Sequence, residues 1–62
     1  MNHRDSSNLY SVWRVVAHWQ DGTSESVDTF DTRKEALRMR DEYALAFGVP
    51  CSLSRTFAAK EG

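Results

Sequence analysis

Several features that mark whole classes of protein are scarce in this chain of 62 residues, which has one cysteine, one proline and three glycines. A single cysteine permits no intrachain disulfide and no thiolate cluster for zinc. No segment approaches the ~20 apolar residues of a membrane span, and residues 1–8 lack the apolar run of a signal peptide. The glycines form no phosphate-binding loop. These absences favour a small protein of a reducing, cytoplasmic compartment.

The net charge and the length of the chain further limit the kinds of protein that this sequence can represent. Nine acidic and eight basic residues leave a formal net charge of -1, unlike the basic balance of dedicated nucleic-acid binders. A domain of this length buries only about 60% of its unfolded surface. A core of this size rarely supplies more than about 3–5 kcal/mol unless a staple or a partner adds to it. We therefore expect a second subunit or another protein to stabilise the fold.

Groups suited to catalysis are few. His3 lies in the polar segment at the start of the chain, and His18 is predicted opposite Glu25 across a hairpin, which is a structural contact. Cys51 falls on the inward register of a strand, which is typical of a small buried hydrophobe. No ligand spacing suggests a metal, and so short a chain has little room for a substrate cleft of ~300 Å³. We expect no enzyme activity, no cofactor and no small-molecule substrate.

The first half of the chain predicts a β-hairpin after a polar tail over residues 1–8. Residues 9–19 are rich in β-branched and aromatic side chains, as strands prefer. Asp21-Gly22 is the signal for a two-residue turn, and residues 24–30 return as the second strand. Counting outward from this turn predicts four pairs: Trp19 with Ser24, Ala17 with Ser26, Val16 with Val27, and Trp13 with Phe30.

The second half predicts a helix and a third strand. Thr32 and Glu35 have the spacing of a capping box, and Gly48 suits the residue after a helix, so the helix should span residues 33–47. Residues 49–57 alternate between apolar and polar side chains, as a half-buried strand does. A tail over residues 58–62 follows. The apolar helix stripe contains Ala36, Leu37, Tyr43, Ala44 and Phe47, flanked by Met39 and Ala46, with Leu45 on the opposite side.

These elements define a small α+β domain, ββαβ, over residues 9–57. The third strand must run parallel to the second and antiparallel to the first. The first strand is the most apolar, so it belongs in the centre, with spatial order 2-1-3. We expect the helix to cover the sheet face that bears Trp13, Val15, Ala17, Trp19 and Phe30.

The opposite sheet face is the first candidate site. Its apolar and polar residues are Tyr10, Val12, Arg14, Val16, His18 and Val27, beside Ser52, Ser54 and Thr56 of the third strand. One helix covers only one face, and an exposed apolar face on so small a domain favours a protein partner or self-association. The alternative is an ordinary valine-rich strand that the N-terminal tail half covers.

The helix start is the second candidate site. Arg33 and Lys34 are cations at the positive end of the helix dipole, and Arg38 follows them, so the start of the helix could bind phosphate. A nucleic-acid site would use these three residues together with Arg14 of the first strand. The alternative is a solvated helix face on which Arg38 pairs with Glu42.

Two further features stay open at this point. Arg40 interrupts the apolar stripe, which leaves three alternatives. Its side chain extends to the edge of the sheet, forms an ion pair with Asp28, or faces a subunit interface. Acidic residues follow the turn and second strand, and they either protect an edge or mimic nucleic-acid phosphates. These are Asp21, Glu25, Asp28 and Asp31.

Residues 12–16, Asp21-Gly22 and residues 29–36 (TFDTRKEA) resemble the arm-type DNA-binding domain of tyrosine recombinases. The resemblance covers about residues 10–45 and implies a basic domain with three strands before its helix. This chain departs from it in charge and in having two strands before the helix, so no functional residue is carried over.

The function we expect is a non-enzymatic, homodimeric protein-interaction module that uses the uncovered sheet face or the third-strand edge. Small accessory and inhibitor proteins of phages and mobile elements are similar in size and architecture. The alternative is a nucleic-acid-binding module that uses Arg14, Arg33, Lys34 and Arg38, with exposed aromatic side chains as stacking surfaces. No membrane association is expected.

Overall fold

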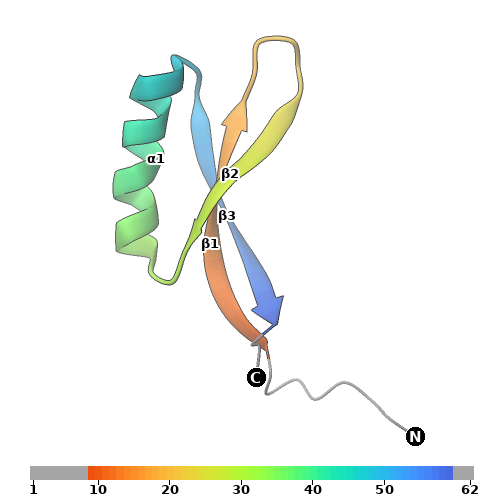
Figure 1. Cartoon of the computed structure of the whole chain (residues 1–62), viewed down its shortest axis with the longest axis vertical. Helices are drawn as coiled ribbons and strands as arrows, with labels where there is room; N and C mark the ends of the chain where they lie inside the picture. Colours follow the sequence, from red (N-terminus) through yellow and green to blue (C-terminus); the bar gives the residue numbers. More distant parts are fainter. Residues whose placement is uncertain (1–8, 60–62) are drawn as a thin grey trace, which may run out of the picture.

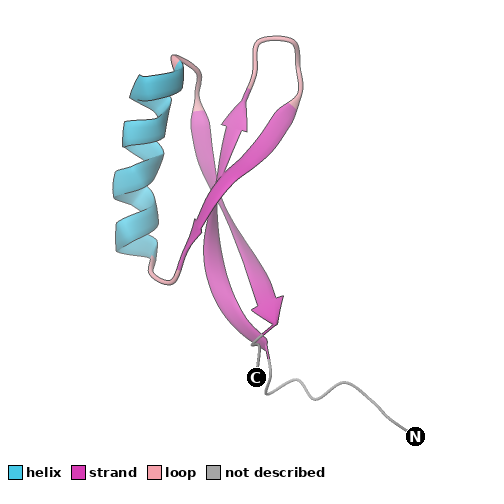
Figure 2. Cartoon of the chain, in the orientation of Figure 1, coloured by secondary structure: helices cyan, strands magenta, loops and turns pink. Residues whose placement is uncertain are grey.

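A computed structural model describes residues 9–59, and its elements follow the predicted order. They are the strands β1 (Leu9–His18) and β2 (Ser24–Phe30), the helix α1 (Arg33–Phe47) and the strand β3 (Cys51–Ala59). The helix lies along one side of a twisted three-stranded sheet (Figures 1 and 2). The predicted α+β class is confirmed.

The third strand lies two residues later than predicted, over Cys51–Ala59 instead of residues 49–57. The predicted tail of residues 1–8 and the last part of the other tail, residues 60–62, lie outside the described residues. Within residues 9–59, no helix is long and apolar enough to cross a membrane.

The sheet has the order β2-β1-β3, with β1 antiparallel to both neighbours. The central place of the most apolar strand is therefore confirmed. Because β2 and β3 are parallel, the connection between them must cross the sheet, and α1 makes that crossing over one face (Figure 1). The sheet consequently ends in two edges, β2 on one side and β3 on the other.

The hairpin turn is longer than predicted. The Trp19 N–H donates to the Thr23 carbonyl at 2.8 Å and the Gly22 N–H donates to the Trp19 carbonyl at 3.1 Å, so the loop has three residues. Gly22 has φ 91°, the left-handed conformation that such loops require at their last position. The Asp21 carboxylate accepts from the Thr23 hydroxyl and N–H at 2.7 and 3.0 Å, which lowers the pKa of Asp21.

The longer loop shifts the pairing near the turn by one residue. Three predicted pairs are therefore wrong, because Ala17 pairs with Glu25, Val16 pairs with Ser26, and Trp19 meets Thr23. A β-bulge next to Val15 and Val16 then takes up Val27 as an extra residue on β2. The bulge restores the predicted register, and the pairing of Trp13 with Phe30 is confirmed.

The helix has the predicted ends. The Thr32 hydroxyl accepts from the Glu35 N–H at 3.2 Å, so the N-cap is confirmed. Gly48 has φ 71° and its N–H donates to the Ala44 carbonyl at 2.9 Å, which closes the last turn. Ala36 is fully buried and Leu45 is 84% exposed, as the predicted stripe requires, whereas Phe47 of the same stripe is 41% exposed.

The core lies between α1 and the sheet face that carries Val15 and Ala17, both fully buried. Contacts between side chains confirm that the helix covers this face: the Tyr43 hydroxyl donates to Asp28 at 2.8 Å, and the rings of Trp19 and Phe47 lie 5.5 Å apart. All buried residues in the described chain are small, namely Val12, Val15, Ala17, Ala36 and Val49. Such a core leaves the fold near the lower limit of stability.

Candidate interaction surfaces

The sheet face opposite the helix is less open than its sequence suggests. Of the six predicted interaction residues, Tyr10 and His18 are exposed, and Val12 is buried with 5% of its surface accessible. The other three, Arg14, Val16 and Val27, are half-buried. The structure therefore places five of these residues along β1 and the sixth at the bulge of β2, without forming a continuous exposed apolar surface.

Polar contacts join the side chains of β1 on this face to those of β3. Arg14 donates from Nη2 to the Ser54 hydroxyl at 3.5 Å, and its Nε is buried without a partner among the described residues. His18 Nε2 lies 2.7 Å from the Ser52 hydroxyl. The predicted contact between His18 and Glu25 is wrong, because the shifted register places His18 opposite Ser24.

The four predicted nucleic-acid residues do not form one surface. Arg14 lies on the face opposite the helix, whereas the Arg33 guanidinium lies 5.9 Å from the Trp13 ring centre on the helix side. Lys34 and Arg38 line a shallow hollow of about 440 Å³ together with Thr32 and Glu35. An extended nucleic-acid strand would therefore need to contact opposite faces of the sheet.

Arg55 of β3 is a cation that the sequence interpretation did not select. Its guanidinium lies 5.6 Å from the Trp13 ring centre, and its Nη2 donates to the Ser11 hydroxyl at 3.4 Å. This cation–π contact lies within the chain and stabilises the fold, because the face of the aromatic ring attracts the positive charge of the guanidinium group.

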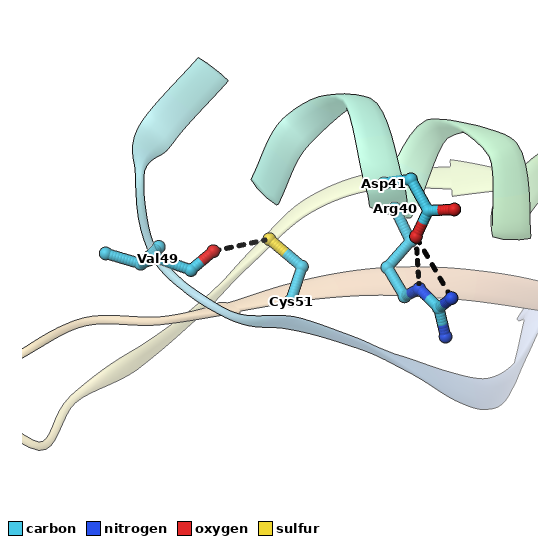
Figure 3. A network of polar contacts seen from close by, with 4 residues as sticks. All are labelled: Arg40, Asp41, Val49 and Cys51. Atoms are coloured by element: carbon cyan, nitrogen blue, oxygen red, sulfur yellow. Dashed lines mark hydrogen bonds and ion pairs between the residues drawn. The ribbon is translucent and has the colours of Figure 1, made fainter. Parts of the chain in front are cut away.

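Arg40 and Cys51 have local partners (Figure 3). Arg40 forms an ion pair with Asp41 at 3.0 Å, so the suggested pairing with Asp28 is wrong. The Cys51 thiol is half-buried and lies 3.9 Å from the Val49 carbonyl oxygen, a weak contact. Within residues 9–59, no group of His, Cys, Asp or Glu side chains could hold a metal ion.

The outer edge of β3 carries backbone groups that have no partner within residues 9–59. The His18 N–H donates to the Pro50 carbonyl at 2.9 Å, which makes this a hydrogen-bonded pair at the start of the β1–β3 ladder. Hydrogen-bonded and non-hydrogen-bonded pairs alternate in an antiparallel ladder, and this register runs without a bulge. The residues that point their N–H and C=O groups away from β1 are Cys51, Leu53, Arg55, Phe57 and Ala59.

The outer edge of β2 is different. Thr29 lies opposite Arg14 at a non-hydrogen-bonded position, so its N–H points away from β1. The Asp28 carboxylate accepts this N–H at 2.8 Å through Oδ1, while Oδ2 accepts the Tyr43 hydroxyl. The bulge at Val27 interrupts the same edge. One side chain therefore caps an outward donor and also ties the edge to the helix.

Apolar side chains are exposed where the sheet continues past the helix. β1 and β3 extend beyond the start of α1 as a two-stranded ribbon (Figure 1). Phe57 is 68% exposed, and Leu9 and Tyr10 are 42% and 45% exposed. Phe57 pairs with Ser11 and therefore shares a face with Leu9, its diagonal neighbour. The free edge of β3 thus ends beside an uncovered aromatic ring.

No family model, curated protein or solved structure matches this chain. The arrangement of its surfaces is the basis for a functional proposal.

Phe57 and Arg55 were missed as site residues by the sequence interpretation. The alternation of residues 49–57 placed Phe57 on the apolar side of a strand, and that side was assumed to be covered. A useful signal was the length of the helix. Fifteen residues at ~1.5 Å each span ~22 Å, whereas the ten residues of β1 span about 33 Å, so one end of the sheet stays uncovered.

Proposed function

We propose that this chain is a non-enzymatic protein-interaction module that forms a homodimer by pairing β3 with β3 of a second copy. The observation that carries the proposal is the row of outward backbone groups on β3, from Cys51 to Phe57, which has no backbone partner within residues 9–59. An unpaired strand edge is a template for pairing with another strand. A partner strand would satisfy each outward donor and acceptor.

Side-chain chemistry supports β3 over β2 as the pairing edge. β3 carries one charged residue, Arg55, across its nine residues and contains neither proline nor lysine. β2 carries Glu25 and Asp28, a bulge, and a capped N–H at Thr29. These are the devices by which proteins prevent edge-to-edge association. Two-fold symmetry then favours β3 against itself, because each copy supplies the same open edge.

The small core supports a dimer rather than a stable monomer. The largest fully buried side chain is Val15, and Phe57 remains mostly exposed. Burial of a phenylalanine contributes about 1.5–3 kcal/mol, which is comparable to the stability of a domain of this size. Covering this ring in an interface would therefore add substantially to the free energy of unfolding.

The test is the solution mass by light scattering across a dilution series, at low and high salt. We expect a dimer whose dissociation constant changes little with salt, because the interface consists of backbone hydrogen bonds and apolar contacts. Arg55→Pro removes an outward N–H of β3 together with the Arg55 side chain and keeps the hydrogen bonds between β3 and β1, so it should yield a folded monomer. Arg55→Ala is the matched control, since it removes the same side chain and keeps the N–H; it should remain a dimer.

A monomeric mass at every protein concentration would contradict the proposal. Steeply salt-dependent binding of single-stranded oligonucleotides by that monomer would then support the nucleic-acid alternative, because polyanion binding releases counterions. The far-ultraviolet circular dichroism spectrum of Arg55→Pro must match that of the wild type, because only a folded variant can be compared with Arg55→Ala in its state of association.

A further inference from the structure

We infer that the two copies pair in one register, with Ser54 opposite Ser54 of the second copy and Phe57 opposite Cys51. This inference rests on the proposed dimer and specifies its interface. An antiparallel pairing with two-fold symmetry must place one residue opposite its own copy. The central positions available within β3 are Ser54, Arg55 and Thr56, since the strand spans Cys51–Ala59.

A register centred on Arg55 is disfavoured by charge. It would place two guanidinium groups directly opposite each other, and like charges at such positions destabilise a sheet. Arg55 is already engaged with Trp13 and Ser11 within its own chain, and it has no carboxylate partner among residues 9–59. No described carboxylate on β3 could neutralise the pair.

The registers centred on Ser54 and Thr56 differ in what covers Phe57. With Thr56 at the centre, Phe57 faces Arg55 of the second copy. Both residues then lie where the sheets extend past the helices, so neither helix covers the ring. With Ser54 at the centre, Phe57 faces Cys51 and lies diagonal to Leu53. Both residues are half-buried and stand near the start of β3 in the sequence. The start of that strand runs alongside α1 (Figure 1).

Burial decides between these two registers. Phe57 is 68% exposed in the single chain, so it gains most from an apolar neighbourhood. The Ser54 register brings this ring against a thiol and a leucine, next to the helix of the second copy. The strand that pairs with the free edge is therefore β3 of a second copy. Its register places each exposed Phe57 against Cys51 and Leu53 of the other strand, in the half of that strand that α1 covers.

Cysteine crosslinking tests the register. Ser52→Cys, Ser54→Cys and Thr56→Cys are made separately in a Cys51→Ala parent, and disulfide-linked dimers are followed by non-reducing mass spectrometry. All three positions are half-buried on the same face, so they are matched in environment. They form non-hydrogen-bonded pairs across the new edge, where Cα atoms lie about 4.5 Å apart, within the range a disulfide needs.

We expect Ser54→Cys to crosslink roughly tenfold faster than the other two variants, because only its sulfurs face each other across the two-fold axis. Faster crosslinking of Thr56→Cys or Ser52→Cys would overturn the register while leaving the dimer in place. Equal rates at all three positions would overturn it as well, since they indicate random collision. Light scattering of the Cys51→Ala parent separates these outcomes from failure of the dimer, for which the parent would be monomeric.

Discussion

The two edges of this sheet have the same central strand as neighbour, yet they present different chemistry to solvent. Along β2, Asp28 caps the outward N–H of Thr29 and holds the Tyr43 hydroxyl, and a bulge interrupts the strand. Along β3, the register is unbroken and one charge stands among nine residues. Within residues 9–59, one edge is closed by its own side chains and the other is left open.

The difference teaches that edge protection depends on where a side chain points. Both strands contain two serines and one threonine, so short polar residues by themselves do not distinguish the two edges. Asp28 protects β2 because its carboxylate reaches both the edge N–H and the helix. Ser52 and Ser54 of β3 instead turn toward His18 and Arg14 on the sheet face, which leaves the edge itself uncapped.

The largest effect is expected on the inner side of β3. Thr56 lies at a hydrogen-bonded position opposite Val12, so Thr56→Pro removes a bond of the sheet itself. Leaving the buried Val12 carbonyl unsatisfied costs about 1–3 kcal/mol, a large share of the ~3–5 kcal/mol that a core of this size supplies. Thermal unfolding followed by circular dichroism should show loss of the cooperative transition. An unfolding midpoint equal to that of Arg55→Pro would contradict the assigned inner and outer sides.

The next effect concerns the exposed aromatic ring of β3. Phe57→Asp should weaken the dimer about 100- to 10,000-fold, because both copies lose a ring whose burial contributes roughly 1.5–3 kcal/mol and 1.4 kcal/mol is a factor of ten. Analytical ultracentrifugation measures the dissociation constant. Leu45→Asp is the matched control, since Leu45 is 84% exposed on the far side of α1. Equal weakening by both variants would indicate a general charge effect.

A smaller effect should follow from opening the second edge. Asp28→Ala uncaps the Thr29 N–H and frees β2 for pairing, so species larger than a dimer should form at high protein concentration. Asp31→Ala is the control, because it removes the same charge from an exposed residue in the neighbouring loop. Size-exclusion chromatography with light scattering reads out both variants. If Asp28→Ala stays strictly dimeric, the bulge alone protects β2.

The smallest effect is a pH dependence of the contact between α1 and β2. The hydrogen bond to Asp28 raises the pKa of Tyr43 above its ordinary value of 10.0, with desolvation adding to the shift. A raised pKa stabilises the fold at pH below the unfolded value, and that stability is lost as the pH rises through the folded value. The unfolding midpoint of the wild type should therefore fall more steeply above pH ~10 than that of Tyr43→Phe. Parallel curves for the two proteins would refute the contribution of this bond.

Local signals in the sequence were sufficient for the elements and their order. Thr32, Glu35 and Gly48 determined both ends of α1, since caps depend on neighbours within a few residues. The apolar character of β1 placed it in the centre of the sheet, because a central strand packs on both sides. The face covered by the helix was predicted from Phe30, which shares a face with Trp13 and leads directly into the helix cap.

The register of the hairpin needed the tertiary structure. Asp21-Gly22 is compatible with a two-residue or a three-residue loop, and the choice moves Val16 from Val27 to Ser26. The bulge at Val27 then cancels the shift, so the far end of the hairpin pairs as predicted. Two irregularities that offset each other leave no trace in a pattern of alternation.

The sequence by itself determined the α+β class, the strand order and the limits of the helix, because these depend on short-range propensity and periodicity. Only the tertiary structure decided how the edge of β2 is capped and which apolar side chains stay uncovered. Asp28 reaches its partners through the twist of the sheet, and Phe57 is exposed because α1 is shorter than the strands it covers. Both outcomes depend on distances between segments that are remote in the chain, and short-range patterns carry no information about such distances.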